Sequence, residues 1–223
     1  MEQRNAGPLE QLRFRAFKLL YSVFSVVMLR DKSWQQPLFA SIDPKSDKRI
    51  LTFGPGSAST AIALAVQFPS VNVVGADPNA KAVKTAKQRI ARRRIPNVSI
   101  VEGTSQGRLP FGAGTFDEVK CLLSFHDVPP DGKIALAKEV LRILRRGGTL
   151  HVADYDKPAA AAEGAVLRLA QYISEPAATE SHVDGSWIQF IAKAGLTGVR
   201  RQSSQSIRIG RVSVVRARKR LSR

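Results

Sequence analysis

From Arg49 onwards, short segments rich in β-branched residues alternate with stretches whose apolar residues recur at helical spacing. This alternation is typical of a parallel sheet covered by helices on both faces. A chain of 223 residues is long enough to bury one such core without disulfides or metals. We therefore expect an α/β fold, with an N-terminal helical cap segment over residues 1–48 and one compact unit over residues 49–223.

Individual strands and helices are predicted from the spacing of apolar residues, which differs between strands and helices, and from turn residues. Strands are expected at Arg49–Phe53, Val71–Ala76, Val98–Glu102, Glu118–Leu123, Thr149–Ala153, Thr197–Gln202 and Ile207–Ala217. A serine-rich turn is expected to separate the last two strands. Helices are expected at Asn79–Arg94, Asp131–Arg146 and Asp184–Ala194, with Pro96, Gly147 and Gly195 preventing their continuation.

The chain has a single cysteine, Cys121, which excludes an internal disulfide and a two-thiolate metal site. No metal site is predicted. The uncharged run Leu19–Leu29 is eleven residues long, whereas a membrane-spanning helix needs about 20. We expect a cytoplasmic protein, and the basic residues before this run would allow peripheral contact with an anionic membrane.

The formal net charge of +17 is unevenly distributed along the chain. Lys81–Arg94 holds seven basic residues and no acid, and Leu196–Arg223 holds nine basic residues and no acid. Such stretches attract polyanions, either nucleic acid or an anionic membrane surface. A solvated basic face that only aids solubility explains them equally well, and the sequence leaves both explanations open.

A glycine-rich turn, Gly54-Pro55-Gly56, follows the first predicted strand and precedes a helix. Glycine allows backbone N–H groups to approach a ligand closely, although a strand-to-helix turn often needs glycine for geometry alone. About twenty residues later the second strand ends at Asp77, where a carboxylate can accept hydrogen bonds from both hydroxyls of a ribose. Together the two features indicate a nucleoside-containing cofactor.

The motifs that follow decide which cofactor this is. The spacing Gly54-x-Gly56-x-Ala58 resembles the GxGxG turn of class I S-adenosylmethionine (SAM)-dependent methyltransferases, and a dinucleotide fingerprint would place glycine where Ser59 stands. Further matches, in the same order along the chain, are Val101–Ser105, Leu109–Phe111, Phe116–Val119, Glu139–Leu150 and Ala153-Asp154. The resemblance covers about Phe14 to Arg218 and is closest to the UbiE-like group of ubiquinone and menaquinone C-methyltransferases.

This resemblance implies a Rossmann-like sheet of seven mostly parallel strands, with helices on both faces and an antiparallel last strand. It also implies SAM as the cofactor, bound by the following residues: Gly54 and Gly56 at the methionine and ribose, Asp77 at the ribose hydroxyls, Pro78 at the adenine face, Thr104 and Ser105 at the adenine edge, with Thr52, Ser57 and Ser124 nearby. Thr52, Ala58 and Thr104 depart from the family pattern. Because neutral acceptors bond more weakly than carboxylates, weaker SAM binding is expected.

Three residues are candidates for catalysis. His126 resembles a histidine of UbiE-like sequences, and its ordinary pKa suits proton transfer; a structural histidine bonded to a backbone carbonyl is the alternative. Asp127 is expected to orient His126 or to cap the following turn. Tyr21 resembles the tyrosine of the family's N-terminal helix, which would close over the acceptor, although it also fits a plain core stripe. Tyr155, Asp156 and His182 lie where this fold tends to place acceptor contacts.

We expect methyl transfer to a small, lipophilic or aromatic acceptor. An RNA methyltransferase is the main alternative because of the net charge, but the segment Ser124–Pro130 lacks the Asn-Pro-Pro-aromatic pattern of amino-methylating nucleic-acid enzymes. A SAM-binding protein that transfers no methyl group is the third class. The oligomeric state does not follow from the sequence.

Overall fold

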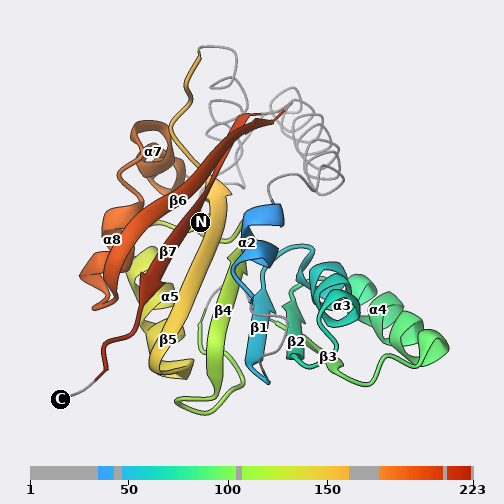
Figure 1. Cartoon of the computed structure of the whole chain (residues 1–223). Helices are drawn as coiled ribbons and strands as arrows, with labels where there is room; N and C mark the ends of the chain where they lie inside the picture. The colour runs from blue at the N-terminus through green and yellow to red at the C-terminus, as the bar shows by residue number, and fades with distance from the viewer. Residues whose placement is uncertain (1–34, 43–46, 104–106, 161–175, 208–209, 222–223) are drawn as a thin grey trace, which may run out of the picture.

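The computed structural model describes residues 35–42, 47–103, 107–160, 176–207 and 210–221 (Figure 1). Its centre is a seven-stranded sheet with the order β3-β2-β1-β4-β5-β7-β6. The strands are β1 (Arg49–Phe53), β2 (Asn72–Asp77), β3 (Val98–Glu102), β4 (Phe116–Leu122), β5 (Leu144–Tyr155), β6 (Thr197–Ile207) and β7 (Gly210–Arg218). The helices are α2 (Gln36–Ala40), α3 (Ser57–Gln67), α4 (Ala80–Arg93), α5 (Pro130–Ile143), α7 (Pro176–Asp184) and α8 (Ile188–Lys193).

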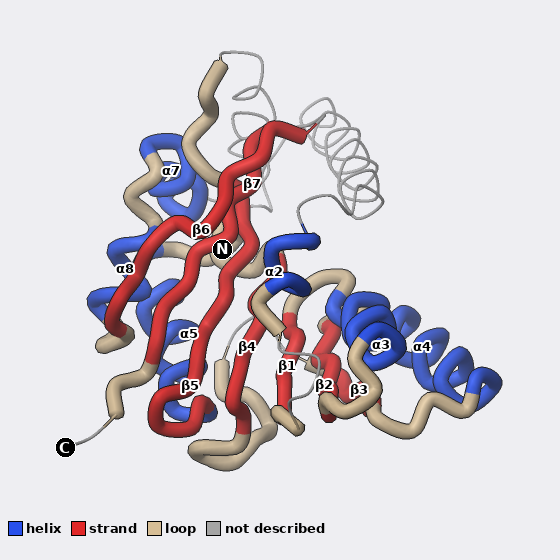
Figure 2. Tube along the Cα trace, in the orientation of Figure 1, coloured by secondary structure: helices blue, strands red, loops and turns tan. Residues whose placement is uncertain are grey.

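Strands β1 to β5 pair in parallel, and β7 pairs antiparallel with both β5 and β6, as the arrows in Figure 1 indicate. Figure 2 shows the strands in red and the helices in blue. The predicted fold class is therefore confirmed, including the antiparallel last strand. Because the parallel strands all end at one edge, the turns after β1, β2, β4 and β5 meet there. Ligands of open α/β sheets bind outside this carboxyl edge.

The two faces of the sheet are covered by different helices. Ile50 of β1 packs in a cluster with α3 and α4, whereas its neighbour Leu51 packs in a second cluster with α5 and α8. Successive strand residues point to opposite faces, so both must be apolar when both faces are buried. A third cluster joins Leu38 of α2 to Leu122 and Tyr155 at the ends of β4 and β5.

Several predicted boundaries were wrong for local reasons. The helix predicted at Asp184–Ala194 begins only at Ile188 as α8, because Asp184 ends α7 and Gly185, with φ +80°, separates the two helices. The serine-rich segment predicted as a turn belongs to β6, which pairs with β7 as far as Ile207. Helix α5 ends at Ile143, because Leu144 is extended and already pairs with Phe116 as the first residue of β5.

Candidate active site at the carboxyl edge

The glycine turn after β1 is shaped by its neighbour β4. Gly54 has φ +108°, and a Cβ atom at this position would lie 2.1 Å from the carbonyl oxygen of Leu122 and 2.2 Å from Oγ of Ser124. Only glycine permits such an approach. Gly56, with φ +80°, is the N-cap of α3. The turn thus brings the end of β1 directly against the segment that follows β4.

The hydroxyl groups predicted near the cofactor are engaged within this turn. Thr52 Oγ1 donates to the carbonyl of Ser57 at 3.1 Å, and Ser57 Oγ donates to the carbonyl of Ala76 at 2.7 Å. Both residues are fully buried. These bonds tie the first turn of α3 to β1 and β2, and direct cofactor contacts from Thr52 and Ser57 stay predictions.

Asp77 ends β2 at the same edge, with 1% of its surface exposed. One carboxylate oxygen accepts from the backbone N–H of Ala58 at 3.3 Å, and the other accepts from the N–H of Asn79 at 3.0 Å. A carboxylate offers about four lone-pair sites, so two bonds do not exhaust it. Asn79, and not Asp77, caps α4, because its side chain accepts from the N–H groups of Lys81 and Ala82.

Of four other predicted site residues, one lies in the described part of the chain. Pro78 is exposed directly after β2, where a flat ligand beside Asp77 would meet it. Thr104 and Ser105 lie outside the described residues, as does Tyr21. Their predicted roles at the adenine edge and over the acceptor therefore stay predictions.

The segment after β4 turns sharply towards the glycine turn. Leu123 has φ +48°, which is uncommon for a residue other than glycine and costs roughly 1–2 kcal/mol. Its N–H still donates to the carbonyl of Ala153 in β5 at 2.8 Å, and Ser124 Oγ donates to the carbonyl of Leu122 at 2.9 Å. The turn places Ser124 beside Gly54 and sends His126 across the end of β5.

His126 lies between two carboxylates. Its Nδ1 is 2.9 Å from Oδ1 of the fully buried Asp154, and its Nε2 is 3.3 Å from Oδ1 of the half-exposed Asp127. Asp154 also accepts from the backbone N–H groups of Phe125 at 2.7 Å and Tyr155 at 2.8 Å. The residue that orients His126 in the interior is thus Asp154, a role that the sequence did not reveal.

These carboxylates set the charge of His126. Burial by itself would lower the pKa of the imidazole, but Asp127 and Asp154 outweigh burial and raise the pKa from 6.5 to about 9. Conversely, the pKa of Asp154 falls from 3.8 to about 2: burial opposes this change, but the His126 charge and hydrogen bond and several smaller contacts overcome it. At neutral pH the pair is an imidazolium and a carboxylate. Both ring nitrogens then carry protons.

A second histidine at this edge, His182, differs from His126 in its charge. His182 of α7 is fully buried, stacks on Trp187 at 5.1 Å and lies 6.3 Å from His126 between ring centroids. Its Nδ1 donates to the carbonyl of Tyr155 at 2.7 Å, and its Nε2 has no hydrogen-bond partner among the described residues. Burial lowers its pKa to about 4, so the ring is neutral. The edge therefore holds one cationic and one neutral imidazole.

Lys133 was missed by the sequence analysis because it stands inside the first turns of a predicted amphipathic helix. Its side chain is fully buried, and its ammonium group donates to the carbonyls of Val128 and Ala178. Burial lowers the pKa of Lys133 from 10.5 to about 8. These bonds connect the segment after β4 to α7 and hold the two histidines in place relative to each other.

Asp156, predicted near the acceptor, has a structural role in the described geometry. Its carboxylate accepts from Trp187 Nε1 at 3.1 Å and from Arg201 Nε at 2.6 Å. Tyr155 lies edge-on to His126, 4.9 Å between ring centroids. Tyr155 thus packs against one histidine of the pair, and Trp187 packs against the other.

Known proteins share this architecture. A family model described as "Methyltransferase domain" matches residues 50–148. A demethylmenaquinone methyltransferase of Deinococcus radiodurans is 28% identical over 75% of this chain and 69% of its own length, and one of Beutenbergia cavernae is 31% identical over 65% and 55%. A solved SAM-dependent methyltransferase of Aquifex aeolicus has a TM-score of 0.58 at 16% identity, covering 82% of this chain and 88% of its own.

The fold, the glycine turn and Asp77, together with these matches, define a class I SAM-dependent methyltransferase, and SAM is its cofactor. Within that class the chain is similar in sequence to demethylmenaquinone methyltransferases and to a ubiquinone/menaquinone biosynthesis C-methyltransferase of Agrobacterium fabrum. The aligned part spans 69% and 55% of the first two relatives' lengths. In the described part of the chain, no helix has the length and hydropathy required to cross a membrane.

Proposed function

We propose that this protein transfers a methyl group from SAM to a small, lipophilic or aromatic acceptor bearing an ionisable hydroxyl group or acidic carbon. The observation that carries the proposal is the buried His126–Asp154 ion pair beside the neutral His182, at the edge where the glycine turn and Asp77 meet. The relatives named demethylmenaquinone methyltransferase support a quinone-type ring as the acceptor.

The cofactor site fits the residues present. Bound SAM supplies a methyl group on a positively charged sulfur. The remaining lone pairs of Asp77 suit two ribose hydroxyls, and Gly54 and Gly56 leave backbone rather than side chain in the turn. Thr52, Ser57, Pro78, Thr104, Ser105 and Ser124 complete the proposed site. Because Thr52 and Thr104 offer no charge, we expect SAM affinity below that of a site with carboxylates at these positions.

His126 assists deprotonation of the acceptor through its charge, because it stabilises the anion that remains when the acceptor releases its proton to bulk water. An imidazolium beside a phenolic oxygen stabilises the phenolate and lowers the pKa of the phenol. The buried carboxylate of Asp154 keeps the imidazole protonated and oriented. The neutral Nε2 of His182 is a hydrogen-bond acceptor, suited to a hydroxyl group on the same ring. One hydrogen-bond donor and one hydrogen-bond acceptor side by side would align the substrate with the methyl group of SAM.

The N-terminal segment completes the proposed enzyme. Residues 1–48 form a helical cap in this proposal, with Tyr21 over the acceptor. The described part of this segment, α2, already packs through Leu38 against Leu122 and Tyr155. A cap of this kind would exclude water from the acceptor and from SAM, which strengthens electrostatic interactions in the active site. We place the protein in the cytoplasm, with peripheral contact with membranes that hold lipophilic acceptors.

Two measurements test the proposal. Isothermal titration with SAM, S-adenosylhomocysteine and NAD should show binding of the first two and not of NAD. Label transfer from methyl-labelled SAM should then reach a demethylmenaquinol or a simpler hydroquinone in preference to RNA. Transfer to RNA alone would establish the nucleic-acid alternative, and SAM binding without transfer to any tested acceptor would favour a binding protein that is not an enzyme.

A further inference from the structure

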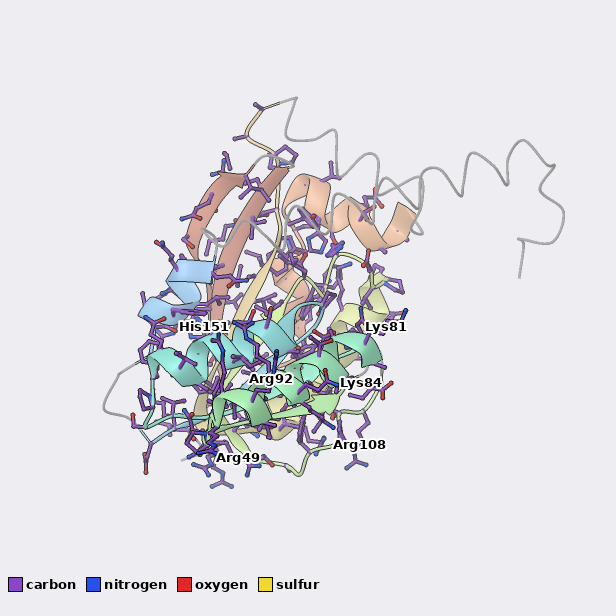
Figure 3. All side chains as sticks on the ribbon, turned by 90° about the vertical axis from the view of Figure 1, so that its right-hand side faces the viewer. Arg49, Lys81, Lys84, Arg92, Arg108 and His151 are labelled. Carbon is purple, nitrogen blue, oxygen red and sulfur yellow. The ribbon has the colours of Figure 1, made fainter. Side chains whose placement is uncertain are left out.

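Helix α4 presents an unusually uniform positive surface. All seven basic residues between Lys81 and Arg94 are exposed, while Val83 and Ala86 bury the opposite side of the helix in the core. Figure 3 looks onto this side of the molecule, where the labelled Lys81, Lys84 and Arg92 of α4 lie with Arg49 and Arg108 below. The proposed methyl transfer uses none of these side chains.

Nothing in the same layer neutralises this charge. Helix α3 has no charged residue, and Asp77, buried in the site, is the only acid between residues 57 and 94. The helices on the other face differ: α5, α7 and α8 together hold four acids and four bases, counting Asp, Glu, Lys and Arg. The helix layer formed by α3 and α4 is therefore strongly positive, whereas the helix layer on the other face is balanced in charge.

The chemistry of this layer favours a partner that is recognised by charge alone. Phe68 is the only aromatic residue from Ser57 to Arg94, and it is buried. Readers of single-stranded RNA stack bases on exposed aromatic side chains, whereas adsorption to anionic lipid headgroups requires only basic residues within a Debye length. Helix α4 also begins at the carboxyl edge, directly after Asp77 and Pro78.

We propose that the outer face of α4 docks the protein on an anionic membrane surface, with lipid phosphates as the partner of Lys81, Lys84, Lys87, Arg89, Arg92, Arg93 and Arg94. This inference rests on the proposed function in one respect: docking would bring the carboxyl edge of the sheet near lipophilic acceptors. The docking itself needs neither SAM nor an acceptor. It can therefore be tested separately from methyl transfer.

The test measures co-sedimentation of the full chain with vesicles of mixed phosphatidylcholine and phosphatidylglycerol, and with pure phosphatidylcholine. The triple variant Lys84→Gln, Lys87→Gln, Arg92→Gln should bind the anionic vesicles about 100-fold more weakly, since each basic residue near such a surface contributes a factor of about five. Glutamine is a good helix former and these positions are exposed, so α4 should persist. Circular dichroism and SAM titration check this directly.

A matched variant removes the same charge elsewhere: Lys138→Gln, Lys193→Gln, Arg200→Gln, all exposed and outside the α3–α4 layer. It should lose much less binding than the α4 variant. Equal losses in the two variants would reduce the effect to net charge and overturn the proposal, as would undiminished binding by the α4 variant. Displacement from vesicles by RNA at equal phosphate concentration, dependent on the α4 residues, would instead assign this face to nucleic acid.

Discussion

The cofactor half and the acceptor half of the carboxyl edge are built in different ways. Apart from Thr104, Ser105 and Ser124, the cofactor half comes from one continuous stretch, residues 50–79, in which Asp77 accepts hydrogen bonds from two backbone N–H groups. The acceptor half combines β4, β5, α5 and α7, and it buries ionised groups at His126, Asp154 and Lys133. Buried charges are stable only with their partners. Function and folding stability should therefore be separable in the first half and coupled in the second.

The largest expected effect is on stability in the acceptor half. Asp154→Ala leaves the buried His126 cation and two backbone N–H groups without their acceptor, which should cost about 3–5 kcal/mol of unfolding free energy. Asp127→Ala removes a half-exposed partner of the same histidine and should cost about 0–1 kcal/mol. Urea unfolding of both variants makes the comparison. Similar small losses would show that the ion pair does not couple function to stability.

The pH dependence of stability follows from the same pair. The folded protein binds the His126 proton more tightly than the unfolded chain, because the pKa is about 9 against 6.5. Protonated His126 contributes about 3 kcal/mol to the unfolding free energy. This contribution is complete below pH 6.5 and is lost as the pH rises to about 9. The difference between wild type and His126→Asn in urea unfolding should shrink across this interval. His182, with its pKa near 4, acts only at lower pH.

Turnover should be the next most sensitive quantity. His126→Ala removes the cation beside the acceptor and should lower turnover by about 10²-fold, with SAM affinity nearly unchanged. Turnover and SAM titration are measured on the same preparation. Unchanged turnover would assign His126 to structure alone, and a parallel loss of SAM affinity would show that the two halves of the site are not independent.

The smallest effect is expected in the cofactor half. Asp77→Ala should lower SAM affinity by at least about tenfold, since charge-assisted bonds are lost. Stability should fall by about 1–3 kcal/mol, less than for Asp154→Ala, because the substitution leaves the backbone N–H groups of Ala58 and Asn79 without this acceptor but leaves no buried charge without its partner. Asn79→Ala is the matched control: it removes the α4 cap at a similar cost in stability and should leave SAM affinity intact. Intact SAM binding by Asp77→Ala would refute the cofactor assignment.

The cofactor half could be predicted because its parts are close in sequence. A glycine turn and a carboxylate at the ends of neighbouring parallel strands must meet at one edge, so Gly54 and Asp77 come together by topology. The sequence patterns that point to the acceptor half are weaker. His126 was found from the resemblance, and His182 only by its general location, whereas Lys133 and the role of Asp154 were missed. Asp154 meets His126 from 28 residues away and Lys133 meets the carbonyl of Ala178 from 45 residues away, beyond any local pattern.

By itself, the sequence determined the alternation of strands and helices, the cofactor turn and the basic helix, because periodicity and local spacing control these features. Only the tertiary structure decided the charge states of the two histidines. Burial penalises both cations alike, and the outcome depends on whether a carboxylate lies within hydrogen-bonding distance. Asp154 provides this contact for His126, while His182 faces a backbone carbonyl, so two chemically identical side chains at one edge hold their protons differently.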